Sequence, residues 1–216
     1  QFQDQGSFVR VLLPNQVFLP THQNKFSQTL TLNPISWTDE KGYKKVLSRF
    51  YNQTSYLIDR MVAREGENFD LNPFQSSDNQ LGLNLSFRNS LFFNRGKQYF
   101  TTNYTYLSTA NENLQSIGSI SNEIESHQLR FLHKIEDTWL VTINAQSGIN
   151  ASSSENFANR NYEIDDLLFK PQLSYLFDNS NRLEVFYQYQ SKDNQINDTA
   201  TLGQQNIGLG WAFNKA

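Results

Sequence analysis

The sequence contains no cysteine and a single methionine among its 216 residues. Without cysteine the chain forms neither disulfide bonds nor cysteine-ligated metal sites. No apolar run approaches the roughly 18–20 residues that a membrane-spanning helix requires, which excludes helical spanning. The net charge is −3 and no basic stripe occurs, so the composition argues against a nucleic-acid partner.

Aromatic residues are abundant instead, with 17 phenylalanines and 10 tyrosines. Such a bias suits β-strands and the aromatic girdles at membrane interfaces. Only 38% of the residues are hydrophobic. Outer-membrane barrels share this moderate value, because half of every strand faces a polar lumen.

Residues 81–108 carry the clearest structural signal. Apolar residues occupy every second position from Leu81 to Phe87, and the alternation resumes from Phe100 to Tyr106. Period-two alternation indicates a strand with one apolar and one polar face. Residues 94–96 end in glycine and suit a tight reversal between the two arms. Each arm has about ten residues, close to the roughly 9–11 that a tilted strand needs to cross a bilayer.

The same alternation recurs along the chain and predicts an all-β, antiparallel transmembrane β-barrel of the outer-membrane type. We expect about nine strands over residues 1–216. Residues 1–80 are less regular, with strands at 7–13, around 26–32 and at 47–62, and a turn or short helix before Leu47. Residues 81–213 form three long hairpins and a final strand. Single-chain bacterial barrels have even strand numbers, whereas the expected number here is odd. We therefore expect the chain to be an incomplete part of a larger barrel.

The alternation also predicts which side chains face lipid and which face the lumen. The expected lipid-facing residues are Leu83, Leu85, Val141, Ile143, Val185 and Leu209. The expected inward residues are Asn84, Thr142, Glu184 and Gly208, together with the cations Arg88, Arg130 and Lys134.

The connections between strands predict an orientation. Short turns at 94–96, 136–137 and 178–181 alternate with long polar stretches at about 109–126, 147–162 and 191–201. Bacterial barrels have short periplasmic turns and long external loops, so we expect the long stretches to be extracellular. Aromatic residues beside the short turns predict a periplasmic girdle of Phe92, Phe93, Trp139, Phe177, Trp211 and Phe213.

A soluble β-sandwich also alternates apolar and polar residues, and it is the main alternative. A secreted sandwich of this kind could bind glycans through exposed tyrosines such as Tyr104 and Tyr106. Sandwich strands are usually shorter, which favours the barrel.

The sequence predicts no catalytic, cofactor or metal site, and hence no enzyme. His22, His127 and His133 are far apart and lack metal-ligand spacing. Asp165 and Asp166, the densest acidic group together with Glu163, point to opposite faces of an extended segment. The remaining candidates are weak: serines in Ser126-His127 and at 152–154, sequons at Asn84 and Asn103, and a short O-glycosylation-like signal at 198–200.

Five segments carry a resemblance to known proteins: residues 3–5, 8–15, 25–34, 47–50 and 58–60. They resemble the C-terminal barrel region of large outer-membrane proteins of Bacteroidota, chiefly flavobacteria. The resemblance implies the bacterial outer membrane and no established activity. It also implies a preceding export-competent portion and further strands, so we expect the chain to be part of a longer protein.

The expected role is therefore a structural, transport or assembly subunit of a cell-envelope complex, including protein secretion or membrane assembly. The expected partners are outer-membrane lipid and other outer-membrane or periplasmic subunits.

Overall fold

The computed structural model describes residues 19–64, 79–96, 99–115, 118–177, 181–196 and 201–213. The strand expected at 7–13 and the short signal at 198–200 lie outside these residues. So do the resembling segments at 3–5 and 8–15.

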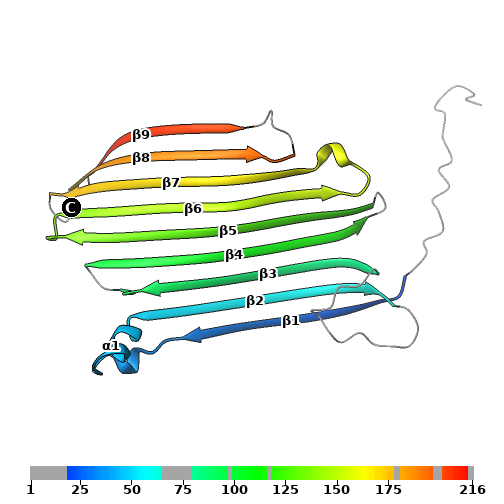
Figure 1. The fold of residues 1–216 in the computed structure, drawn as a ribbon, viewed down its shortest axis with the longest axis horizontal. Helices are drawn as coiled ribbons and strands as arrows, with labels where there is room; N and C mark the ends of the chain where they lie inside the picture. Colours follow the sequence, from blue (N-terminus) through cyan, green and yellow to red (C-terminus); the bar gives the residue numbers. More distant parts are fainter. Residues whose placement is uncertain are drawn as a thin grey trace, which may run out of the picture.

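The described residues form one antiparallel sheet in which nine strands follow each other in sequence order (Figure 1). The strands are β1 Thr21–Leu32, β2 Phe50–Ala63, β3 Gln80–Phe93, β4 Phe100–Gln115, β5 Gly118–Ile135, β6 Trp139–Ser154, β7 Tyr162–Leu176, β8 Asn181–Asn194 and β9 Leu202–Phe213. Three short helical segments accompany them: η1 Ile35–Trp37, α1 Tyr43–Leu47 and η2 Ala158–Arg160. The predicted short helix before Leu47 is confirmed as α1, at the end of the sheet where β2 begins (Figure 1).

The sheet is open in the part of the chain that the structure describes. There, β1 pairs with β2 and β9 pairs with β8, so each outer strand has one neighbour. The prediction of an all-β antiparallel fold is confirmed, whereas closure into a barrel is not observed. The described residues form one sheet and not the two packed sheets of a sandwich.

The register separates two chemically different faces. Directly paired residues in an antiparallel sheet project to the same side. One side, the apolar face, carries Ile58, Leu85, Phe131, Ile143, Phe169 and Val185. The other side, the polar face, carries Arg88, Thr105, Ser126, Thr142, Asp166 and Ser174. The period-two pattern of the sequence thus persists across the whole sheet.

The predicted face assignments agree with this register. All six residues expected to face lipid lie on the apolar face. Asn84, Thr142, Glu184 and Gly208 lie on the polar face, and so do the cations Arg88, Arg130 and Lys134. Contact of the apolar face with lipid remains a prediction.

The predicted short turns at 94–96 and 136–137 are confirmed, whereas the predicted long loops are wrong in their extent. β4 extends to Gln115 and β5 begins at Gly118, so most of residues 109–126 belongs to two paired strands. β6 likewise continues to Ser154 and β8 to Asn194. The outer parts of these strands carry polar residues on both faces, which hides the period of two while backbone pairing continues. The connections after β6 and β8 remain longer than those after β5 and β7, so the extracellular orientation stays a prediction that rests on a smaller asymmetry.

Aromatic rings line one end of the sheet, as the girdle prediction expected for most of its residues. Trp139 contacts Tyr175, which contacts Phe177, with ring centroids 4.7 Å apart in both pairs. Phe177 stacks on Trp211 at 6.0 Å. Further along the same end, Phe93 contacts Phe50 at 4.8 Å and Phe100 at 5.7 Å. We call the set Phe50, Phe93, Phe100, Trp139, Tyr175, Phe177 and Trp211 the aromatic row.

Phe92 does not belong to the aromatic row, which corrects the girdle prediction. It pairs with Tyr51 and Asn103 on the polar face, because adjacent strand residues point to opposite sides. Its ring contacts Tyr51 at 5.8 Å and lies 5.3 Å from the Arg95 guanidinium carbon. The side chain of Phe213 lies outside the described part of the structure.

Candidate functional site

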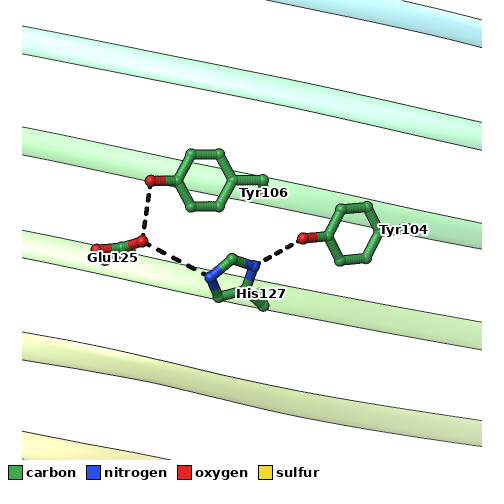
Figure 2. Close-up of polar contacts among 4 residues, drawn as sticks. All are labelled: Tyr104, Tyr106, Glu125 and His127. Atoms are coloured by element: carbon green, nitrogen blue, oxygen red, sulfur yellow. Dashed lines mark hydrogen bonds and ion pairs between the residues drawn. The ribbon is translucent and has the colours of Figure 1, made fainter.

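Four polar side chains meet on the apolar face where β4 and β5 run side by side (Figure 2). Tyr104 and Tyr106 come from β4, while Glu125 and His127 come from β5. Residues two apart on a strand share a face, and the register pairs Tyr106 directly with His127. We call these four residues the tyrosine–histidine cluster.

Two hydrogen bonds and one longer contact between charged groups connect the four members of the cluster. The Tyr104 hydroxyl lies 2.7 Å from His127 Nδ1, and the Tyr106 hydroxyl donates to Glu125 Oε1 at 2.9 Å. His127 Nε2 lies 3.6 Å from the same carboxylate oxygen. The Tyr106 and His127 rings are 4.8 Å apart. Both imidazole nitrogens therefore face partners within the cluster.

The tyrosine–histidine cluster does not pair a serine nucleophile with a histidine base. Ser147 pairs with His127 across β5 and β6 and shares its face. His127, however, directs one nitrogen at Tyr104 and the other at Glu125. Nucleophilic catalysis requires a base that hydrogen-bonds the nucleophile, which this geometry does not provide.

The cluster lies at the border between apolar and acidic parts of the apolar face. Toward the aromatic row, the next residues of β5 on this face are Leu129 and Phe131. In the opposite direction Glu123 follows Glu125. Tyrosine and histidine combine an apolar body with a polar tip, so they suit such a border.

An open cavity of about 570 Å³ adjoins the cluster and contains further carboxylates. Asp165, Asp193 and Glu125 line it together with Leu167 and Tyr189. Asp165 accepts a hydrogen bond from Gln195 Nε2 at 2.6 Å. Within the described ranges, no group of three or more histidine or acidic residues is arranged to hold a metal ion.

The other residues singled out in the sequence are dispersed. Asp165 lies on the apolar face and Asp166 on the polar face, as predicted, where Gln146 and Gln190 both donate to Asp166 at 3.4 Å. Ser126 lies on the polar face, so the structure does not join it with His127.

The remaining candidates also have separate surroundings. His133 Nδ1 lies 2.7 Å from the Tyr99 carbonyl oxygen. The buried His22 on β1 pairs with Val62 on β2. Ser152 donates to Asn122 at 2.8 Å. The sequons at Asn84 and Asn103 lie within β3 and β4, as predicted.

The polar face carries an excess of cations among the described strand residues. Its cations are Lys25, Arg88, Arg130, Lys134, Lys170, Arg182 and Lys192. Its carboxylates are Asp59, Asp166 and Glu184. Lys25 is 3.8 Å from Asp59, and Arg182 is 3.1 Å from Glu184. Arg130, Asn144 and Lys170 form a cross-strand row without a carboxylate, so the middle of this face is positively charged.

The tyrosine–histidine cluster was missed by sequence reasoning because it depends on register. Glu125 falls within residues 109–126, which read as a loop, so its place on the same strand face as His127 was not readable. The partner strand and its offset were not readable either. Only the pairing of Tyr106 with His127 brings the four groups together.

Comparisons with models of known protein families, with curated proteins and with solved structures found no match. None of the helices in the described residues is both long and apolar enough to cross a membrane.

Proposed function

We propose that the chain forms part of a bacterial outer-membrane β-barrel that serves as a structural, transport or assembly subunit of a cell-envelope complex. The observation that carries this proposal is the inverted distribution of side chains. Leu173 and Val185 on the apolar face, both on strands with two neighbours, are 43% and 45% exposed. Ser174 and Thr105 on the polar face are 1% and 5% exposed. Large exposed apolar patches mark surfaces that contact a membrane or another protein.

Strand length supports lipid as the medium around the apolar face. The nine strands contain 12 to 18 residues. A strand tilted in a bilayer needs roughly 9–11 residues, so each is long enough to span it. The aromatic row would lie at one membrane interface, where the aromatic girdles of outer-membrane barrels occur.

The apolar region also runs obliquely to the strands. One cross-strand row contains Ile58, Leu85 and Ala110 on β2 to β4, and continues into Glu123 on β5 and Glu163 on β7. At the aromatic end, by contrast, Val141, Leu173 and Val185 form an apolar row on β6 to β8. Strands of outer-membrane barrels tilt by about 35–45°, so a lipid band crosses them at an angle.

The open edges require partners under this proposal. Unpaired backbone groups in hydrocarbon cost several kcal/mol each, so lipid-exposed sheet edges do not occur. β1 and β9 would therefore pair with further strands of a larger barrel or with a neighbouring subunit. The resemblance to Bacteroidota outer-membrane proteins points to the same environment.

The glycan-binding alternative is not favoured by the arrangement of the tyrosines. The hydroxyls of Tyr104 and Tyr106 hydrogen-bond within the tyrosine–histidine cluster. Their capacity to bind sugar hydroxyls is correspondingly reduced. The single sheet also lacks the second layer of a sandwich in the described residues.

Single-cysteine labelling of the full protein in its native membrane tests the proposal. The absence of cysteine from these 216 residues removes competing thiols within them. Leu85→Cys on the apolar face should resist a water-soluble maleimide and react with a lipid-soluble one. Its neighbour Asn84→Cys, exposed on the polar face, should react with the water-soluble reagent. Equal reactivity toward the water-soluble reagent, or release of the protein into buffer without detergent, would contradict membrane insertion.

A further inference from the structure

Two cavities adjoin at the end of the sheet that carries the aromatic row. The first, of about 790 Å³, lies among α1, the start of β2 and the turn after β3. The second, of about 520 Å³, lies between the η1–α1 segment and the apolar face. Asn33 and Phe50 line both cavities, so the two spaces share a wall.

The first cavity is cationic. Lys45, Arg49 and Arg95 line it, and none of the described residues that line it is acidic. The nearby Lys44 is different, because it pairs with Glu40 at 3.8 Å and does not line the cavity. Three cations without a carboxylate favour the binding of an anion.

Arg95 is held in a defined orientation. Its guanidinium carbon lies 4.2 Å from the centre of the Tyr51 ring and 5.3 Å from that of Phe92. A guanidinium stacked on an aromatic face keeps its N–H groups at its edge, where they match phosphate oxygens. A backbone hydrogen bond also joins the turn after β3 to the residue before β2, since Asn94 N–H donates to the Arg49 carbonyl oxygen at 2.9 Å.

The second cavity is apolar. Leu32, Phe50 and Leu91 on the apolar face line it, together with Trp37 and Leu47 from the η1–α1 segment. Leu32, Trp37 and Leu47 are exposed. The space is therefore open to an apolar ligand on the face assigned to lipid.

We propose that the two cavities together bind an anionic phospholipid. Its phosphate would contact Lys45, Arg49 and Arg95, while an acyl chain would lie against Leu32, Trp37 and Leu91. A simple anion would need only the first cavity, and an apolar ligand only the second. Tyr51 and Phe92, which contact Arg95, lie on the polar face, whereas Leu32 and Leu91 lie on the apolar face. The two cavities share Asn33 and Phe50 at the end of the sheet, so one ligand with a charged and an apolar part would fill both around that end. Basic pockets between transmembrane helices bind phospholipid head groups through the same pairing of cations with phosphate.

This inference rests on the proposed membrane function, and it adds a specific lipid site to it. The test uses the full protein in micelles doped with phosphatidylglycerol or phosphatidylcholine of identical acyl chains. Native mass spectrometry then counts the lipids that each variant retains. The wild type should prefer phosphatidylglycerol, and Lys45→Gln, Arg49→Gln and Arg95→Gln should each lower that preference about fivefold.

Two further variants make the test specific. Arg160→Gln is the matched control, because Arg160 also stacks on an aromatic ring, Phe157, at 4.9 Å but lies in the β6–β7 connection. It should leave the preference unchanged. Leu32→Asn, which alters the apolar cavity, should reduce retention of both lipids without changing their ratio. Unfolding temperatures of all variants should stay close to that of the wild type.

Several outcomes would overturn the lipid site. One is an unchanged preference for phosphatidylglycerol in a triple variant that combines Lys45→Gln, Arg49→Gln and Arg95→Gln. Another is a loss of that preference in Arg160→Gln equal to the loss in the three single variants. Displacement of the lipid by equimolar glycerol phosphate would show that the site binds a free phosphate compound. An acidic peptide that stays bound in the mass spectrum in place of lipid would show that the site binds protein. A detergent-dependent protein without lipid preference contradicts this inference alone. A protein that is soluble in buffer and retains neither lipid contradicts the proposed function as well.

Discussion

The ring of Phe186 occupies the space that a side chain at Gly208 would require. The two residues are direct cross-strand partners on β8 and β9, and both lie on the polar face. Lys170 Nζ lies 4.5 Å from the centre of the same ring. Glycine weakens a strand interior, and an aromatic ring from the neighbouring strand compensates for the missing side chain. Phe186 thus adds a side-chain contact to the backbone pairing of β8 and β9.

We expect Gly208→Ala to destabilise the β8–β9 pair by about 1–3 kcal/mol, because the new methyl group forces the Phe186 ring to move. Gly203→Ala in the same strand is the matched control, since a Cβ there meets nothing within 4 Å. Denaturant unfolding of both variants measures the difference. Equal stabilities would mean that Phe186 does not pack on Gly208.

A similar contrast applies to Gly148 on β6. A Cβ at this position would meet the Glu125 carbonyl oxygen and the Ser126 backbone, which cannot move as a flexible side chain can. We expect Gly148→Ala to cost about 1–3 kcal/mol and to disturb the β5–β6 pairing. At Gly82 the nearest atom would be 3.5 Å away, so Gly82→Ala should stay within about 0.5 kcal/mol of the wild type. Amide hydrogen exchange along β5 is the measurement. Unchanged protection in Gly148→Ala would refute the close contact.

Membrane insertion predicts unequal effects for charges on the two faces. Arginine at a lipid-facing position near the bilayer midplane costs about 2–4 kcal/mol, whereas lumen positions tolerate charge. Leu85→Arg should therefore impair assembly, and Asn84→Arg, exposed on the polar face, should not. The yield of folded protein in the outer-membrane fraction measures this. Similar yields for both variants would count against the assignment of the apolar face to lipid.

The hydrogen bond between Tyr106 and Glu125 should be measurable as a coupling. A double-mutant cycle with Tyr106→Phe and Glu125→Gln should give about 0.5–1.5 kcal/mol, the usual net value of one hydrogen bond. Tyr189 lines the same cavity as Glu125, so Tyr189→Phe provides a control cycle, which should give a coupling near zero. If both cycles give the same coupling, the cluster is not a specific network.

Much of the strand arrangement was readable because strand periodicity is local. The alternation from Leu81 to Tyr106 predicted β3 and β4 and assigned their faces correctly. The same rule shows the error in the predicted girdle, since adjacent Phe92 and Phe93 cannot share a face. The strand ends were not readable, because Glu112, Ser121 and Glu123 place polar side chains on the otherwise apolar face and remove the periodic signal.

The sequence by itself determined that the strands carry one apolar and one polar face, because successive side chains of a strand project to opposite sides. Tertiary structure decided the register, which depends on pairing between residues distant in the chain. Register pairs Tyr106 with His127, and the return of the chain after β3 places Arg95 beside Lys45 and Arg49 at one cavity. Both contacts depend on backbone hydrogen bonds between residues far apart in the sequence, so no local sequence pattern predicted them.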